Sequence, residues 1–161
     1  MMNKQDIYDL LNENKIEYKA ANHPAAFTVE DIESFNLDNP ENGAKNLFLR
    51  DDKKRNYYLL VVKDDKTISI KEFQEKAGTR RLSFASEDDL MKYMNLIKGA
   101  VTPFGVLNDK ENIVKIYIDK YFENNYIWVH PNDNTASVYL KTEDLVSIIK
   151  KHGNSVQYID I

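Results

Sequence analysis

The chain has 161 residues, of which 42% are hydrophobic and 30% charged, and its formal net charge is −4. These values are typical of one globular domain that is large enough to bury a single core. The absence of cysteine excludes disulfides, thiolate catalysis and cysteine-based zinc sites. No apolar run approaches the roughly 20 residues of a membrane span, and the polar first residues lack the apolar region of a signal peptide. A cytoplasmic location without a membrane partner is therefore expected.

Positive charge is concentrated in residues 41–81. This segment contains eleven Lys or Arg and seven Asp or Glu, a balance of +4, whereas the remainder contains eleven and nineteen, a balance of −8. A local basic surface on an acidic protein can bind the phosphates of an RNA end. The same lysines can also serve only to solvate an exposed hairpin, and the charge pattern alone favours this second interpretation.

The first part of the chain predicts two helices, a strand and a loop. Asn3 can cap a first helix, which has apolar residues at i, i+3 and i+4 spacing. Alternating apolar and polar residues indicate a half-buried strand at about 16–20. Thr28 can cap a short second helix, and the Asn, Asp and Pro of residues 34–42 indicate a loop.

The middle of the chain predicts a hairpin, two helices and a short strand. Apolar segments 45–50 and 57–62 flank a charged stretch, a pattern typical of a β-hairpin. A helix is predicted over 69–77, because a serine can cap its start and a glycine follows its end. A strand at 82–85 precedes a helix at 86–97, which has acidic residues at its positive end.

The last part of the chain predicts four strands and one helix. The expected strands are 113–118, 126–130, 136–140 and, at a sheet edge, 156–159. A helix is predicted to begin with a cap at Thr142 and to end at Gly153. No internal repeat or linker is visible, so we expect a single domain over residues 1–161. Its fold class is α+β, with a mixed β-sheet packed against several helices.

Several kinds of chemistry have no sequence support. The three histidines lack the spacing of a zinc motif. The chain has neither the GxSxG turn of a serine hydrolase nor a Walker-type phosphate loop. The adjacent pairs Asp64-Asp65 and Asp88-Asp89 fit a turn and a helix cap better than a carboxylate dyad. No metal, no cofactor and no covalent intermediate are therefore expected.

Lys45 is a candidate for substrate binding, because it lies where the chain enters a buried strand. An ammonium at that place can bind a phosphate, a hydroxyl or a carbonyl in a cleft. Alternatively, the stem of a lysine at the start of a strand packs on apolar neighbours while the ammonium reaches water. The residue alone favours this structural interpretation.

The segment 99–105 combines two glycines with a proline. Gly99 permits a positive φ and a close approach by a ligand, whereas Pro103 restricts the turn and removes one donor. Free backbone N–H groups in such a loop could stabilise an oxyanion on an ester carbonyl. Alternatively, Gly99 is only the C-cap of a helix and the rest is an ordinary loop.

His130 follows an apolar strand, at the place where that strand reaches the edge of its sheet. A histidine there could position water, donate a hydrogen bond or narrow a pocket. A structural role is the alternative for a single histidine at a strand end. His23 has the same two interpretations with less support.

Four motifs together resemble the YbaK/ProX family of aminoacyl-tRNA editing domains, which hydrolyse amino acids attached to the wrong tRNA. The motifs are HPAAFTVE at 23–30, GAKNLFLR at 43–50, GAVTPFG at 99–105 and HPNDNTAS at 130–137. Their order and spacing are similar to those of the family's stand-alone prolyl-tRNA editing proteins. The likeness is closest to the branch that deacylates Ala-tRNA(Pro).

The resemblance implies a set of site residues. Lys45 is expected to hold the terminal aminoacyl-adenosine, and the amides of Gly99 and Ala100 to bind the ester carbonyl. The expected substrate-binding residues are Thr28, Val29, Thr102, Pro103, His130 and Asn134. Arg50 and Arg80 are expected to contact the acceptor stem, so the resemblance favours RNA binding by the basic segment.

The implied function is trans-editing of Ala-tRNA(Pro) by metal-independent ester hydrolysis. Prolyl-tRNA synthetase makes this product because a site built for proline excludes a smaller residue by only about 1–3 kcal/mol. The implied partners are a mischarged tRNA(Pro) and prolyl-tRNA synthetase. Three alternatives stay open: a deacylase for Cys-tRNA(Pro) or another aminoacyl-tRNA, a catalytically silent module that binds tRNA or a synthetase, and a small-molecule esterase or amidase.

Overall fold

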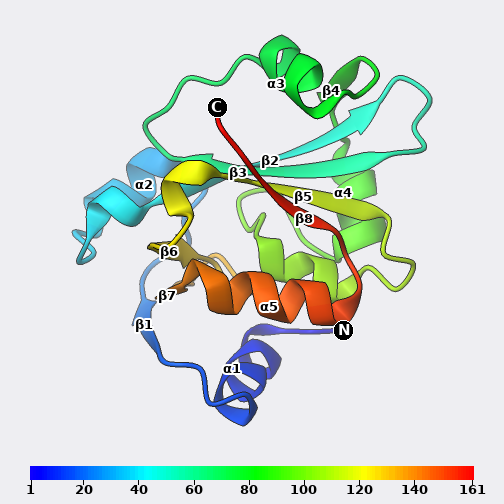
Figure 1. Cartoon of the computed structure of the whole chain (residues 1–161). Coiled ribbons are helices and arrows are strands. Elements are labelled where there is room, and N and C mark those ends of the chain that lie inside the picture. The colour runs from blue at the N-terminus through cyan, green and yellow to red at the C-terminus, as the bar shows by residue number, and fades with distance from the viewer.

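The computed structural model describes residues 1–161 and contains two β-sheets (Figure 1). The larger sheet consists of β2 (Ala44–Asp51), β3 (Tyr57–Lys63), β4 (Leu82–Phe84), β5 (Val114–Asp119) and β8 (Val156–Ile159). Its order is β4-β2-β3-β5-β8, with antiparallel pairing among β4, β2 and β3 and parallel pairing of β5 to both neighbours. The sheet is therefore mixed, and β8 is an edge strand as predicted.

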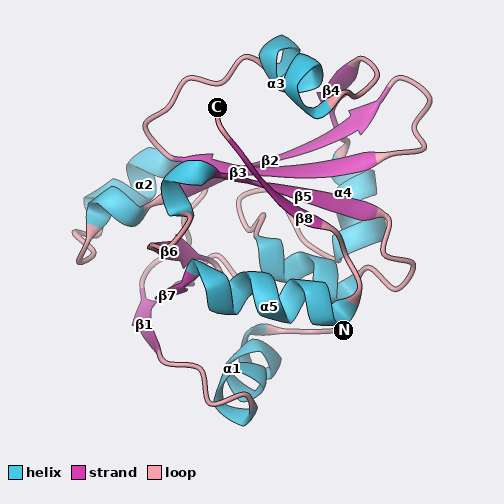
Figure 2. Ribbon diagram, in the orientation of Figure 1, coloured by secondary structure: helices cyan, strands magenta, loops and turns pink.

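The smaller sheet is antiparallel and lies near one end of α5 (Thr142–His152) (Figure 2). It contains β1 (Tyr18–Asn22), β6 (Tyr126–Val129) and β7 (Ala136–Lys141) in the order β1-β7-β6. A parallel bridge between Gly43 and Trp128 joins the start of β2 to this sheet. The α+β class is confirmed, but the strands form two sheets and not one.

The remaining helices are α1 (Lys4–Glu13), α2 (Val29–Ser34), α3 (Ile70–Ala77) and α4 (Glu87–Met94). Short 3-10 helices occur at Pro40–Asn42, Pro103–Asn108 and Lys120–Phe122. The predicted caps Asn3 and Thr28, and likewise Ser86 before α4, each accept a hydrogen bond from the third helical residue, whose aspartate bonds back to the cap's backbone. No helix has the length and apolar character that crossing a membrane requires.

Two helix ends differ from the sequence prediction. Helix α4 ends at Met94, before the predicted residue 97, because Asn95 adopts a left-handed conformation with φ of 53°. Asparagine tolerates this conformation better than most residues, so it ends the helix four positions before Gly99. The cap of α5 is Lys141, and Thr142 is instead the first helical residue, with its side chain buried.

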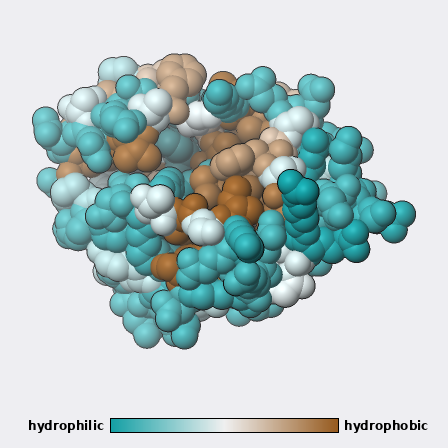
Figure 3. All heavy atoms as spheres, turned by 90° about the horizontal axis from the view of Figure 1, so that it is seen from above, coloured by the Kyte–Doolittle hydropathy of each residue, from teal (hydrophilic) through white to brown (hydrophobic).

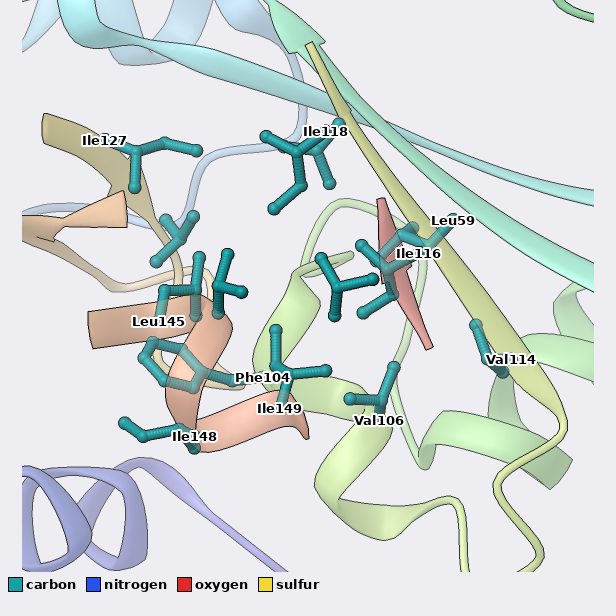
Figure 4. Close-up of a cluster of buried hydrophobic side chains, with 14 of the residues drawn as sticks. Leu59, Phe104, Val106, Val114, Ile116, Ile118, Ile127, Leu145, Ile148 and Ile149 are labelled. Atoms are coloured by element: carbon teal, nitrogen blue, oxygen red, sulfur yellow. The ribbon is translucent and has the colours of Figure 1, made fainter. Parts of the chain in front are cut away.

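Both faces of the larger sheet are covered, and β3 is accordingly buried at every residue before Lys63. The larger core lies between this sheet and α4, α5 and the 3-10 helix 103–108, and Phe104, Ile116 and Ile149 are among the side chains that fill it (Figure 4). A smaller core forms on the opposite face, around Phe73 of α3. On the face that carries α3 and β4, hydrophobic side chains gather near the centre of a largely hydrophilic surface (Figure 3).

Candidate active site

A cavity of about 580 Å³ lies between the start of β2, the segment leading into α2, the connection from β4 to α4, and the loop after α4. Five of the eleven predicted site residues line it: Thr28, Val29, Lys45, Gly99 and His130. They come from four separate segments of the chain. The tertiary structure therefore brings together the four motifs that the sequence analysis singled out.

Thr102 and Asn134 lie behind the cavity wall and hold its parts together. The Thr102 hydroxyl donates to the backbone carbonyl of His130 at 2.5 Å. Asn134 exchanges two hydrogen bonds with Ala26, one from its side-chain amide and one to its backbone carbonyl, both at 3.0 Å. Pro103 is buried at the start of its 3-10 helix. None of these three predicted substrate-binding side chains lines the cavity.

The loop at Gly99 requires glycine for two reasons. Its φ is +90°, a conformation that side chains disfavour, and an added Cβ would lie 2.9 Å from Cδ1 of Phe27 and 3.3 Å from the carbonyl oxygen of Ala26. The loop and the segment before α2 therefore touch at Gly99. Any side chain at this position would force the two walls of the cavity apart.

The amides of this loop differ in their hydrogen bonding. The Ala100 amide donates to the carbonyl of Ile97 at 3.1 Å, so it is already used within the turn. Gly99 and Val101 both line the cavity, and neither amide has an acceptor within the protein. The amide donors available to a ligand are thus those of Gly99 and Val101, whereas the resemblance implied Gly99 and Ala100.

Lys45 lines the cavity from the edge of β2. Strand alternation turns Asn46 and Phe48 toward the larger core and Lys45 toward the opposite face. β4 pairs with β2 only from Leu49 onward, so β2 is an exposed edge beside Lys45. The Lys45 ammonium donates to the backbone carbonyl of Lys66. Because an ammonium has three donors, two remain for a ligand.

Asn46 is a cavity residue that the sequence analysis missed. Its side-chain amide donates to the carbonyl of Val101 at 3.2 Å, and its side-chain oxygen is buried without a donor. A buried acceptor without a partner is uncommon. The signal in the sequence was an amide side chain directly before the apolar run of β2.

His130 presents a hydrogen-bond acceptor. Its Nδ1 lies 2.8 Å from the carbonyl of Ala136. A carbonyl only accepts, so Nδ1 carries the proton and Nε2 has the free electron pair. Burial, together with the nearby ring of His23, lowers the pKa of His130, and the hydrogen bond to Ala136 only partly opposes this. The imidazole is therefore neutral near pH 7.

His23 supports the wall next to His130. The two rings are 6.1 Å apart, and the His23 ring stacks on Phe35 at 4.7 Å. Its Nε2 bonds to the hydroxyl of Ser137 at 2.9 Å and its Nδ1 to the carbonyl of Pro24 at 2.8 Å. Both ring nitrogens are thus occupied, and His23 does not line the cavity.

The two predicted RNA-binding arginines are both in ion pairs. Arg50 lies 2.6 Å from Asp89, and both side chains are largely buried. Arg80 forms two bonds to Asp52, at 2.6 Å and 2.9 Å, in an exposed pair. A guanidinium has five N–H donors, so an arginine in such a pair can still donate to a phosphate. No group of three or more His, Asp or Glu side chains is arranged to hold a metal ion.

Comparison with known proteins gives the family. Residues 23–148 match the aminoacyl-tRNA editing domain. The chain is 45% identical over 159 residues to the prolyl-tRNA editing protein ProX of Acetoanaerobium sticklandii. This alignment covers 98% of this chain and 97% of that protein. It is 27% identical to the prolyl-tRNA synthetase associated domain-containing protein 1 of Xenopus laevis, over 94% of this chain and 92% of that protein.

Solved structures agree in fold. A candidate trans-editing enzyme for prolyl tRNA synthetase superimposes with a TM-score of 0.73 and 15% identity, over 99% of this chain and 97% of that chain. The match to the family covers most of the chain and includes all four motifs. The chain therefore belongs to the aminoacyl-tRNA editing domain family.

Proposed function

We propose that this protein, as one domain over residues 1–161, is a trans-editing hydrolase that removes alanine from Ala-tRNA(Pro). The observation that carries the proposal is the pair of free amides, at Gly99 and Val101, in a cavity that Lys45 and a neutral His130 also line. The family and the relative named as a prolyl-tRNA editing protein support the same activity.

The cavity offers no activated side-chain nucleophile. The hydroxyls of Thr28 and Ser86 each accept a helix-capping hydrogen bond, and no base is bonded to either. Water is therefore the attacking group. It adds to the ester carbonyl while the neighbouring hydroxyl of the terminal ribose accepts a proton from it and passes its own proton to the ester oxygen. The acyl C–O bond then breaks, so that alanine leaves as a carboxylic acid and the ester oxygen becomes a ribose hydroxyl.

The protein lowers the barrier through positioning and charge. The amides of Gly99 and Val101 donate to the oxyanion that forms when water adds, and loss of one such donor typically costs a factor of about 10²–10³ in rate. The two free donors of Lys45 hold the ribose or phosphate of the terminal nucleotide. The ammonium of alanine donates to His130 Nε2, which lacks a donor in the free protein.

The deciding experiment is hydrolysis of Ala-tRNA(Pro) by the purified protein, with Pro-tRNA(Pro) and Cys-tRNA(Pro) as parallel substrates and EDTA present. We expect release of alanine alone, at a rate that EDTA does not change. Preferential release of cysteine would retain the chemistry and change the substrate. Absence of hydrolysis, with tRNA still bound, would identify a binding module. Equal hydrolysis of simple alanyl esters would identify an esterase.

The proposed partner is tRNA(Pro) that carries the wrong amino acid, with prolyl-tRNA synthetase as a second partner. The name of the Xenopus laevis relative supports an association with the synthetase. Addition of purified synthetase to the deacylation assay tests it. We expect kcat/KM to rise in the presence of the synthetase, and an unchanged value would leave tRNA as the sole partner.

A further inference from the structure

Two exposed phenylalanines line the candidate active site. Phe27 is 62% exposed and Phe84 is 60% exposed, and both line the cavity. The other large hydrophobic side chains with high exposure are Met1, Met91, Ile97 and Tyr126, and none of them lines it. Single exposed hydrophobic residues are common on proteins, but two aromatic rings at one cavity mark a binding surface.

The backbones of both phenylalanines are held by hydrogen bonds. The amide of Phe27 donates to the Asp31 carboxylate at 2.9 Å, and the residue packs directly on Gly99. Phe84 pairs with Leu49 at the end of β4, and the following amide donates to the carbonyl of Phe48 at 2.9 Å. The backbones that carry the rings are thus held in place, while both residues stay mostly exposed.

Phe84 borders a different part of the cavity from His130. The lining residues of β2 run from Ala44 to Phe48, a distance of about 13 Å along a strand. His130 follows β6, which is joined to the start of β2 by the bridge at Gly43. Phe84 is paired at the other end of this stretch. The cavity is therefore long enough to hold an aminoacyl group at one end and a larger flat group at the other.

We infer that Phe27 and Phe84 form the surface on which the unpaired terminal base of the aminoacyl-tRNA stacks. The inference rests on the proposed function and identifies how the same site holds the nucleotide. Unpaired bases at RNA ends are commonly bound by stacking on aromatic side chains. Lys45 and Lys98 line the same cavity and can neutralise the adjoining phosphates. A base with its phosphate matches this combination of rings and cations.

The experiment measures binding without catalysis. An uncharged acceptor-stem hairpin of tRNA(Pro) is compared with the same RNA carrying an abasic ribose at its 3′ end. We expect the native protein to bind the abasic RNA about 10- to 100-fold more weakly, the usual contribution of one stacked base. Phe84→Ala and Phe27→Ala should reduce the ratio of the two dissociation constants, abasic over intact RNA, toward one. Phe84→Tyr should preserve this ratio because the ring is retained.

Met91→Ala is the matched control, since Met91 is 45% exposed on α4 and lies outside the cavity. It should retain the full ratio. Equal binding of both RNAs by the native protein, or an unchanged ratio in both alanine variants, would overturn the inference. The binding assay hydrolyses no ester, so the two proposals can fail separately. If the intact RNA binds more tightly than the abasic RNA but Ala-tRNA(Pro) is not deacylated, only the proposed function is refuted. If Ala-tRNA(Pro) is deacylated but the two RNAs bind equally, only the stacking surface is refuted.

Discussion

The Lys45 ammonium donates a hydrogen bond to the backbone carbonyl of Lys66. Lys66 is itself anchored, because its ammonium donates to the Asp119 carboxylate at 3.0 Å and to the carbonyl of Ile161 at 2.8 Å. Asp119 is almost wholly buried and also accepts from the amides of Lys63 and Tyr121. The position of Lys45 at the cavity thus depends on a turn that the end of β5 and the last residue hold in place.

Replacement of Lys66 with methionine should loosen this turn. The change leaves the buried carboxylate of Asp119 without its cation, and we expect a loss of about 1–3 kcal/mol in the free energy of unfolding. It should also lower kcat/KM for Ala-tRNA(Pro), because the carbonyl that holds Lys45 is no longer fixed. Urea denaturation and deacylation kinetics measure the two effects. Lys71→Met, at an exposed lysine without an ion pair, is the control and should change stability by less than about 0.5 kcal/mol; equal losses in both variants would contradict the prediction.

Replacement of Gly99 with alanine should impair both stability and activity. Gly78 also has a positive φ, of +68°, but an added Cβ would meet nothing within 4 Å there. Gly78→Ala therefore measures the backbone cost alone, about 1 kcal/mol. Gly99→Ala adds the contact with Phe27 and Ala26, so it should lose more stability in thermal denaturation and reduce kcat/KM at least tenfold. Similar results for the two variants would show that the walls of the cavity do not touch in solution.

The lowered pKa of His130 predicts a pH-dependent contribution to stability. Its pKa lies below the ordinary value of about 6.5, so as pH falls through that value the unfolded chain takes up a proton before the folded protein does. The stability that neutral His130 contributes is present above about pH 6.5 and declines between this value and the lower folded pKa. Activity should decline with it, because protonation removes the Nε2 acceptor.

Urea denaturation of the native protein and of His130→Gln, from about pH 8 to about pH 5, measures this contribution. The free energies of unfolding of the two proteins should converge as pH falls, since the glutamine does not titrate. A difference that stays constant over this range would show that His130 has an ordinary pKa in the folded protein.

The two ion pairs predict different effects when Arg80 and Arg50 are replaced. Arg80 and Asp52 are both exposed, so Arg80→Gln should leave stability nearly unchanged. It should raise KM for Ala-tRNA(Pro), and the slope of log KM against log salt should fall by about one if Arg80 contacts a phosphate. Arg50→Gln should instead cost about 1 kcal/mol of stability, because it leaves a largely buried Asp89 without its cation. A salt slope that Arg80→Gln does not change would remove Arg80 from the RNA interface.

The secondary structure could be predicted from the sequence to a large extent. Caps such as Asn3 and Thr28, and the alternation in the hairpin of β2 and β3, act over only a few residues, and the structure confirms them. The prediction was wrong at the end of α4, because glycine at position 99 was taken as the stop and Asn95 was overlooked. Both residue types can adopt the left-handed conformation, so their order along the chain decides where a helix ends.

The candidate site was predicted less completely. The resemblance identified the four segments, five of whose predicted residues line the cavity. The sequence did not show which way the side chains of these segments point or which hydrogen bonds they form. Asn46 and Val101 were missed, since only the tertiary structure shows which polar atoms are left without partners.

The sequence by itself determined the α+β class, most of the helices and strands, and membership of the editing family. These depend on local periodicity, on caps within one turn and on motifs of a few residues. Only the tertiary structure decided the division into two sheets, the use of the Ala100 amide within its turn, and the edge position of Lys45. Such features depend on contacts between segments far apart in the chain, where burial and hydrogen bonding choose among many pairings that are locally equivalent.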